Sequence, residues 1–600
     1  MHSDATILTR VRIWAKALGV ALVGLLALGV AGAGADTSAT VRIVGTSDVN
    51  ESGLFQNVIE PRFEAAFPQY ELSYTPSSES AAASNAEAGT GGPSVLLLHN
   101  QALESKFVAG GYSYENQYGS ALFYSDYVLA GTTGDVADVA ANGGHDIARA
   151  FADVAAAGVT GGTTFLSRGG TITAPASTIE EHAIWKLVFD SGLTPAGVTL
   201  CSVSEADGGG MAPVTSAAQP TPGGPCPESG TVNSATDAPS WYHLSAGLNQ
   251  SANVIAANNC TVPVNGSTNC YALTDRGTFN YLMSGNDPAG TISNLAVLSA
   301  DQSPTAPGGA SELLTHFHAY MINPAKSGET VNLQGARDLV GFLASPFGQG
   351  QIGSYLASAG KSPGAPFKPD AAPAVTAAPS TTSVRAGSPV TVTGSVSDPE
   401  PGYPGLAGQP VIVRGPGGGQ LASGLIDAHG GYSVAFTPPA SGSYEVAVPA
   451  ISRLVEPAAV PPFGDLLAPT ASAPFALTVT AAEGPRTSAE GVRVTRVTVR
   501  KGLVTVTGAL DSPAGQGAGV ALLVARAGKL AQPGKHRGAR TAAAGKKKAK
   551  QIAKTALAAG ATKFTIKHRL PRGFRYALQV SYAAPGQSTV TSKPKRVAVP

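Results

Sequence analysis

Small hydroxyl residues follow the first predicted strand of the chain. Thr46 and Ser47 stand in the run Gly-Thr-Ser-Asp at 45–48, between a strand pattern at 40–44 and a helical pattern that starts near Ser52. Backbone N–H groups and hydroxyl donors gather where a strand turns into a helix, and anions bind at such places. The alternative is that these hydroxyls only cap the helix, which is a common role of Ser and Thr there.

A second loop repeats this layout. Ser167 and Arg168 open the run Ser-Arg-Gly-Gly-Thr at 167–171, which follows a strand pattern at 163–166 and precedes a helical pattern. The guanidinium of Arg168 offers planar, permanently charged donors, and the two glycines allow the backbone to approach a ligand closely. An ordinary surface Arg in a Gly-rich turn is the other interpretation. The repeated layout favours an oxyanion held between the two loops.

Two further motifs supply weaker candidates. Thr274 and Arg276 lie in the run Thr-Asp-Arg-Gly-Thr at 274–278, where Asp275 beside Arg276 is typical of a local ion pair that shapes a helix start. We therefore favour a supporting role for this motif over direct ligand contact. Ser251 lies in a run that opens another helix and is a further candidate donor.

Short apolar strands alternate with amphipathic helices from 36 to 366, which predicts an α/β domain of βαβ-like units. Within it, the stretch 201–237 is dominated by Gly, Pro, Ser and Thr, so we expect a surface insertion there. The other expected elements are strands at 94–99, 127–130 and 271–273 and helices at 54–67, 148–156, 179–189 and 336–343.

Helical patterns end after residue 366. We expect a linker at 367–373, an immunoglobulin-like β domain at 374–480 and a second β domain at 490–600. Lys and Arg recur among Ala and Gly at 527–554, which predicts a mobile basic loop. Such a loop could bind an anionic cell-wall polymer, although a flexible solvated loop is the simpler interpretation.

The N-terminal segment indicates export. Basic residues precede an uncharged apolar run at 17–30, and small residues follow up to 35, so 1–35 reads as a secretory signal peptide, with an uncleaved anchor as the alternative. No Cys follows the apolar run, which excludes a lipid-modified N-terminal Cys. We expect an extracellular, cell-surface or periplasmic protein.

The cysteines fit an oxidising compartment. Of the three pairings of four cysteines, Cys201–Cys226 with Cys260–Cys270 is favoured, because each bridge closes a short loop. A zinc site is disfavoured because no Cys-x-x-Cys pair is present.

Several classes of function lack support in the sequence. The 40 Lys and Arg nearly balance the 39 Asp and Glu, so no net charge favours nucleic acid as a partner. Motifs of serine hydrolases, zinc proteases and P-loop proteins are missing, so we expect no enzyme. His316 and His318 alternate on a predicted strand without neighbouring acids in the sequence, which favours a structural role over a metal site.

The order of the motifs resembles the tungstate-binding periplasmic proteins of the solute-binding superfamily over about 320 residues. The resemblance implies two α/β lobes that close on one tetrahedral oxyanion, with hydroxyls, backbone amides and an Arg as donors, no cofactor, and an ABC permease as partner. The matching positions are 45–47, 52–54, 95–99, 104–112, 124–128, 167–169, Glu181, Trp185, Trp241, Tyr242, 274–278, Asn323, Pro324 and 345–349.

The chain departs from this family at two places. Asp48 and Glu51 lie between Ser47 and Ser52, where family members carry Thr and Ser, and two acids repel a dianion unless they point outward. After Arg168, the family's acidic and Thr-His residues are replaced by 170–175. We predict an exported substrate-binding protein that captures an oxyanion of the tungstate or molybdate class for an ABC importer. The alternative is a cell-surface or secreted adhesion protein with a degenerate receptor domain.

Overall fold

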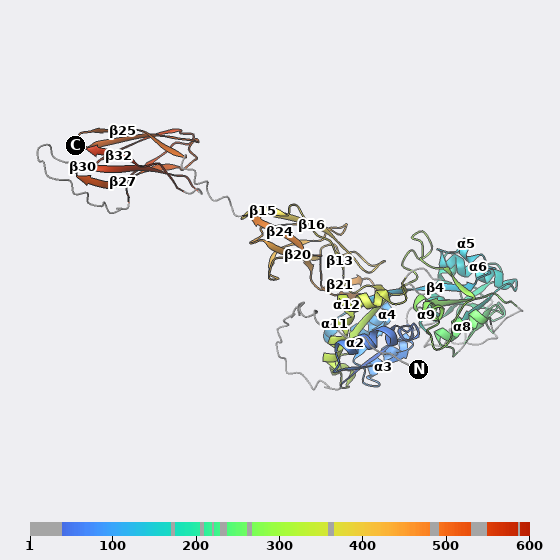
Figure 1. Cartoon of the computed structure of the whole chain (residues 1–600). Coiled ribbons are helices and arrows are strands. Elements are labelled where there is room, and N and C mark those ends of the chain that lie inside the picture. Colours follow the sequence, from blue (N-terminus) through green and yellow to red (C-terminus); the bar gives the residue numbers. More distant parts are fainter. Residues whose placement is uncertain are drawn as a thin grey trace, which may run out of the picture. The chain divides into compact units, whose positions relative to one another are not determined.

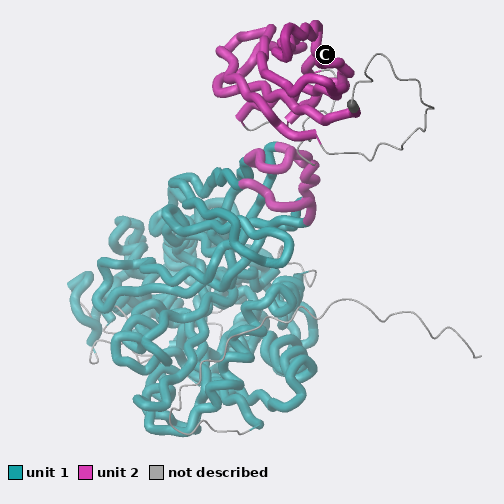
Figure 2. Tube along the Cα trace, turned by 90° about the vertical axis from the view of Figure 1, so that its left-hand side faces the viewer, with its two compact units in different colours: residues 1–380, 391–436, 443–475 teal, residues 381–390, 437–442, 476–600 magenta. Residues whose placement is uncertain are grey.

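The computed structural model describes residues 39–169, 175–203, 209–218, 221–227, 237–245, 247–260, 267–357, 365–480, 491–529, 549–585 and 589–600. The chain divides into two compact units (Figure 2). The first comprises 1–380, 391–436 and 443–475, and the second 381–390, 437–442 and 476–600. The predicted signal peptide lies outside the described residues. None of the described helices is both long and apolar enough to cross a membrane.

The first unit contains two α/β lobes, each with its own buried core (Figure 1). In lobe 1 the strand order is β2, β1, β3, β11. β1 runs parallel to both β2 and β3, whereas β11 runs antiparallel to β3. The strands of lobe 1 are β1 (Thr40–Thr46), β2 (Glu71–Ser77), β3 (Val95–Leu98) and β11 (Leu314–Met321). Its helices are α1 (Ser47–Glu51), a π-helical turn (Phe55–Ile59), α2 (Glu60–Ala66), α3 (Glu79–Ala88), α4 (Gln101–Ala109), α10 (Pro324–Ser327), α11 (Leu333–Ala344) and α12 (Pro346–Ser354).

Lobe 2 extends the same sheet through β9, β5 and β8. Its core packs Trp185, Phe151 and Phe165 between the sheet and the helices α6 and α7. The strands are β5 (Thr164–Ser167), β6 (Thr199–Val203), β7 (Gly210–Val214), β8 (Tyr242–Leu244), β9 (Cys270–Asp275) and β10 (Leu295–Ser299). The helices are α5 (Val139–Asn142), α6 (Ile147–Val159), α7 (Ala176–Asp190), α8 (Gln250–Asn259) and α9 (Arg276–Ser284). The two-lobed α/β class predicted from the sequence is confirmed.

One long strand, β4 (Gly119–Thr132), belongs to both lobes. Its first half pairs with β11 of lobe 1, from Ser120 to Asp126, and its second half pairs with β9 of lobe 2, from Tyr127 to Gly131. The change of partner between Asp126 and Tyr127 marks the boundary of the lobes. Side chains near this point can therefore contact both lobes.

The segment 201–237, which we expected to be a surface insertion, is partly buried in the residues that the structure describes. β6 and β7 form an antiparallel pair that packs on α7, and Leu200, Cys201 and Ala212 are fully buried. The Cys201–Cys226 and Cys260–Cys270 bridges are both present. The first bridge joins the β6–β7 pair to the following turn, so a segment rich in Gly and Pro contributes to the core of lobe 2.

The predicted linker at 367–373 is also not an open connection. Phe367 and Ala371 are buried, and β12 (Lys368–Pro369) pairs with β4. Asp370 is 1% exposed, and its carboxylate lies 2.8 Å from Nδ1 of His316. The composition of the segment is that of a linker, but its apolar and acidic side chains are buried against lobe 1.

Strands from the segment beyond 373 continue the contact with lobe 1. β22 (Phe463–Leu467) pairs in parallel with the start of β4 and antiparallel with β21 (Ile451–Glu456). The other strands of this β-rich segment are β13 (Ala374–Val375), β14 (Ala378–Pro379), β15 (Ser383–Arg385), β16 (Val390–Ser397), β17 (Pro410–Arg414), β18 (Gln420–Leu425), β19 (Gly431–Phe436), β20 (Gly442–Val448), β23 (Thr470–Ala471) and β24 (Phe475–Thr480). Part of this segment is thus integrated into the first unit.

Buried charges accompany the β22–β4 pairing. Arg453 on β21 is 9% exposed and contacts the carboxylates of Asp398, Glu400 (2.5 Å) and Asp465 (2.9 Å). Nε2 of His318 lies 3.3 Å from Glu400, and its Nδ1 lies 3.1 Å from Glu104. The two histidines of β11 therefore do have acids beside them, contrary to the reasoning from sequence, because these acids come from remote parts of the chain.

The C-terminal segment is entirely β within its described residues and has its own apolar core between Val492 and Val599. Its strands are β25 (Val492–Arg500), β26 (Leu503–Leu510), β27 (Gly519–Lys529), β28 (Lys550–Ala556), β29 (Lys563–Arg569), β30 (Phe574–Ala583), β31 (Val590–Thr591) and β32 (Lys595–Val599). The ends of the predicted basic loop at 527–554 are paired strand, since Gly528 and Lys529 of β27 pair with β30, and Lys550 to Lys554 of β28 pair with β27. The remainder, 530–548, lies outside the described residues.

Candidate functional site

The candidate site lies where helix α1 of lobe 1 meets lobe 2. α1 follows β1 directly and contacts both α8 and α9. The approach is close: a Cβ built on Gly277, in the first turn of α9, would lie 2.8 Å from Cβ of Ser52. The glycine of the Thr-Asp-Arg-Gly-Thr motif is thus required by the contact between the lobes.

The first predicted loop places its hydroxyls at this junction. Thr46 is 1% exposed, and its Oγ1 has no hydrogen-bond partner among the described residues. The carbonyl of Thr46 accepts a hydrogen bond from the Tyr74 hydroxyl at 2.6 Å. Ser47, the first residue of α1, is half-buried. A buried hydroxyl without a partner is costly, so Thr46 is the more informative of the two.

The second predicted loop is tied to the start of α8. The Arg168 guanidinium donates to Oε1 of Gln250 at 3.0 Å and to the carbonyl of Leu248 at 3.2 Å. Ser167 is buried, and its Oγ accepts a hydrogen bond from the Gly169 backbone N–H at 3.1 Å. Residues 170–174 lie outside the described residues. Arg168 therefore both positions the N-terminus of α8 and adds positive charge beside it.

An acidic side chain of lobe 1 already contacts that N-terminus. The backbone N–H of Ser251 donates to Oε2 of Glu51 at 2.8 Å, and Arg168 attracts the same carboxylate. Burial raises the pKa of Glu51, and the Ser251 N–H and Arg168 offset only part of this effect. The hydroxyl of Ser251 itself donates to Asp287 at 3.0 Å. The backbone of Ser251, rather than its side chain, thus provides the donor at this position.

The third predicted motif is engaged in structural contacts. Arg276 forms a buried two-point ion pair with Asp126 of β4, with Nε and Oδ1 2.6 Å apart. Asp275 caps α9 by accepting a hydrogen bond from the Thr278 N–H at 2.7 Å, and the Thr274 hydroxyl donates to the Asp275 carbonyl. The structure therefore brings Thr46, Ser47, Ser251 and Arg168 to one junction, whereas Thr274 and Arg276 support its walls.

A buried histidine with two acidic partners was not anticipated from the sequence. Nε2 of His99 lies 2.9 Å from Oδ2 of Asp48, and its Nδ1 lies 3.3 Å from Glu79. Burial alone would lower the pKa of His99, but Glu79 and Asp48 raise it to about 9. Burial also raises the pKa of Glu79, to about 7. His99 therefore carries a positive charge that holds the Asp48 carboxylate at the junction. Only the resemblance, which includes position 99, gave any indication of it.

Tyr127 completes the junction from the crossing strand β4. It is 1% exposed, it lies opposite Asp275 in the β4–β9 pairing, and its ring centroid is 6.5 Å from that of His99. Its hydroxyl has no hydrogen-bond partner in the described part of the chain. Burial, followed by Asp48 and Glu79, raises its pKa, so the hydroxyl stays protonated as a donor.

Two carboxyl groups of lobe 2 face the same region. Burial raises the pKa of Asp275 to about 8, with Asp48 as the next contributor. Burial likewise raises the pKa of Glu180 to about 8, and its Oε1 has no partner among the described residues. The junction thus combines hydroxyl and backbone donors, two cations and several carboxyl groups. Such a set can bind a small polar ligand by both donating and accepting hydrogen bonds.

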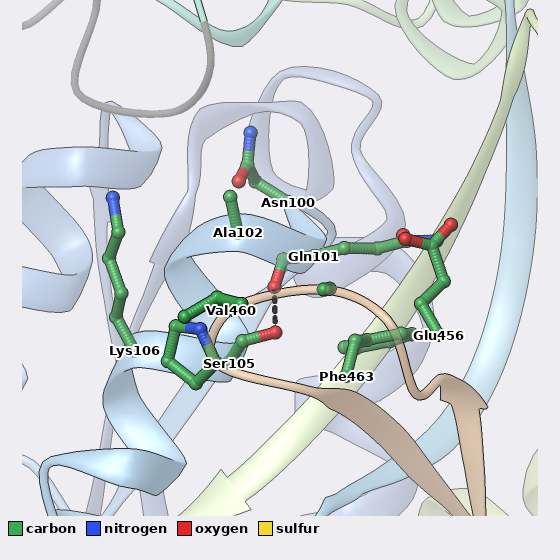
Figure 3. A pocket seen from close by; sticks show the side chains of 10 residues that line it. Asn100, Gln101, Ala102, Ser105, Lys106, Glu456, Val460 and Phe463 are labelled. Atoms are coloured by element: carbon green, nitrogen blue, oxygen red, sulfur yellow. Dashed lines mark hydrogen bonds between the residues drawn. The ribbon is translucent and has the colours of Figure 1, made fainter.

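A separate pocket of about 320 Å³ lies between α4 and the turn of the β21–β22 hairpin (Figure 3). Gln101 and Ser105 of α4 form one wall, where the Ser105 hydroxyl donates to the Gln101 carbonyl at 2.7 Å. Val460 and Phe463 of the hairpin line the other. None of the residues at the lobe junction lines this pocket.

Comparisons with known proteins give matches among solved structures only. No family model matches the chain, and no curated protein does. The tungstate-binding protein TupA of Desulfovibrio alaskensis is 22% identical, with a TM-score of 0.35, and the match covers 55% of this chain and 98% of that one. A putative periplasmic metal-binding protein is 16% identical, with a TM-score of 0.36 over 55% of this chain and 95% of that one. The Azotobacter vinelandii periplasmic molybdate-binding protein is 8% identical, with a TM-score of 0.28 over 52% and 96%. These similarities do not assign a ligand to this chain.

Proposed function

We propose that the chain is an exported solute-binding receptor that captures a tetrahedral oxyanion at the junction of its two lobes and delivers it to an ABC permease. The bound anion would contact the Ser251 N–H, the Arg168 guanidinium and the hydroxyls of Thr46 and Ser47. The tungstate or molybdate class is what the sequence resemblance implies. Appended β strands would then stabilise the receptor lobe, and the basic segment at 530–548 is a candidate contact for an anionic cell-wall polymer.

One observation supports the proposal most directly: an anion already occupies the N-terminus of α8. The carboxylate of Glu51 accepts the Ser251 N–H at 2.8 Å and is attracted by Arg168. A helix N-terminus beside a guanidinium stabilises negative charge, whether the charge belongs to a side chain or to a ligand. An external oxyanion would take the same donors when Glu51 withdraws.

Thermal unfolding of the full chain with a panel of oxyanions tests the proposal, because a ligand that binds only the folded state raises its stability. We expect at least one tetrahedral oxyanion to raise the melting temperature. The Arg168→Ala variant should lose most of that shift, because it removes a ligand donor. The Arg276→Ala variant should melt earlier but retain the shift, because its partner is Asp126. A melting temperature that no oxyanion changes would contradict the receptor function and leave the adhesion protein as the better account.

A further inference from the structure

The lobe junction contains acceptors as well as donors. Asp48 is 2% exposed and directly follows Thr46 and Ser47, and Glu51 lies one helical turn further along α1. An ionised carboxylate only accepts hydrogen bonds, so it repels an oxyanion whose oxygens all lack protons. An oxyanion that carries a proton can instead donate a hydrogen bond from its O–H group to the carboxylate.

Asp48 is fixed in place as such an acceptor. His99 is the one hydrogen-bond partner of its carboxylate among the described residues, and it binds Oδ2 at 2.9 Å. His99 is in turn held by Glu79, whose carboxylate lies 3.3 Å from Nδ1, so the imidazole orients the Asp48 carboxylate. His99 contacts Oδ2 of Asp48, so the other carboxylate oxygen, Oδ1, is left to accept a hydrogen bond from a ligand.

Two buried hydroxyls without partners lie around this carboxylate. Thr46 and Tyr127 are each 1% exposed, and neither hydroxyl has a hydrogen-bond partner in the described part of the chain. The Tyr127 ring packs edge-on against the His99 ring, with centroids 6.5 Å apart, and His99 binds Asp48. Buried polar atoms are almost always satisfied in folded proteins, so unsatisfied donors beside a fixed acceptor indicate a ligand with both kinds of group.

We propose that the junction selects an oxyanion that keeps a proton at neutral pH, of the hydrogenphosphate or hydrogenarsenate class, over the fully deprotonated tungstate, molybdate and sulfate ions. The O–H group of the ligand donates a hydrogen bond to the Asp48 carboxylate. The unprotonated oxygens accept hydrogen bonds from the Thr46 and Tyr127 hydroxyls, the Ser251 N–H and Arg168. The inference rests on the proposed function and specifies its ligand.

Selectivity arises because a dianion without a proton leaves Asp48 facing an oxygen of like charge. A buried acceptor that faces another acceptor loses its hydrogen bond and adds repulsion, which discriminates more strongly than a change of ligand size. Tungstate and phosphate share their tetrahedral shape, so the acceptor, and not the shape of the site, separates them.

Isothermal titration of the full chain at neutral pH with phosphate, arsenate, sulfate, molybdate and tungstate tests this proposal. We expect phosphate and arsenate to bind on the order of 100-fold tighter than the other three ions. The Asp48→Asn variant keeps the shape of the side chain but supplies an N–H donor, so it should reverse the preference in favour of sulfate and tungstate. The wild-type panel alone decides the question if Asp48→Asn does not fold.

The outcomes distinguish a failure of the proposed ligand selectivity from a failure of the proposed receptor function. Tungstate or sulfate binding as tight as phosphate would overturn the inference and leave the oxyanion receptor intact. An unchanged order of affinities in a folded Asp48→Asn variant would overturn the role of Asp48. Absence of heat with every ion would reject the receptor function and the inference with it.

Discussion

Glu51 shows how one residue can occupy the position of a ligand. Its carboxylate joins α1 of lobe 1 to the N-terminus of α8 in lobe 2, across 200 residues of sequence. Because it uses the Ser251 N–H, it competes with any external anion for that donor. The same contact joins the two lobes.

Replacing Glu51 with Ala should therefore tighten oxyanion binding by about tenfold, since the competing carboxylate and its repulsion are both removed. Titration calorimetry with phosphate measures the change. Glu60, a half-buried acid in the first turn of α2, provides the control, and Glu60→Ala should leave the affinity unchanged. Weaker binding by Glu51→Ala would show that Glu51 supports the ligand site instead of competing with the ligand.

Buried carboxyl groups at the junction predict the direction of the pH dependence. Burial raises the pKa of Asp275 and of Glu180, each to about 8, and of Glu79 to about 7. The folded state thus binds more protons than the unfolded state between the ordinary pKa values of these acids and the raised ones. Their stabilising contribution is fully present below the ordinary values and is lost as the pH rises through the raised ones.

The free energy of unfolding should therefore fall as the pH increases from about 5 to about 9. Urea denaturation at a series of pH values measures it. The Asp275→Asn variant keeps a side chain that can cap α9, so it should fold and show a shallower decline. Stability that rises over this range would contradict the protonated state of these groups.

At the scale of the elements, local patterns predicted the loops but not their contacts. The hydroxyl and Arg loops at the ends of β1 and β5 follow from strand and helix periodicity within a few residues. Asp48 meets His99 across 51 residues, and Arg453 meets Glu400 across 53, so no local pattern contains these pairs. Remote contacts also explain why the segment at 367–373 was predicted to be a linker. Its composition is that of a linker, but its side chains are buried against strands from other parts of the chain.

The contact of β21 and β22 with lobe 1 depends on a buried cation. Arg453→Met leaves the carboxylates of Asp398, Glu400 and Asp465 without their shared partner, which should lower the free energy of unfolding by about 3 kcal/mol or more. Arg414→Met is the matched control, because Arg414 forms an exposed pair with Glu445 at 3.7 Å. That change should cost under about 1 kcal/mol. Equal losses in urea denaturation would argue against a stabilising role for the network.

At the scale of the whole molecule, the unit that holds the two lobes does not end where the α/β pattern ends. A chain ending at residue 366 loses Asp370 and Glu400, which contact His316 and His318, and it loses β22 from the edge of β4. We expect this chain to aggregate or melt well below the full protein. A chain ending at residue 480 should retain the melting transition of the receptor, because the C-terminal segment has its own core.

Differential scanning calorimetry of the two truncated chains beside the full chain checks this expectation. A chain ending at 366 that melts like the full protein would show that the strands beyond 373 are dispensable for the receptor. It would also return these strands to the role of a spacer, which composition alone suggests.

The most direct test of the account is a pair of crystal structures of the full chain soaked with arsenate and with selenate, whose heavy atoms are located by anomalous scattering. Arsenate keeps a proton at neutral pH and selenate does not. We predict an arsenate peak bounded by Thr46, Asp48, Arg168 and Ser251, with Glu51 displaced, and no selenate peak there. An arsenate peak elsewhere, or no peak at the lobe junction in either crystal, would contradict the central claim.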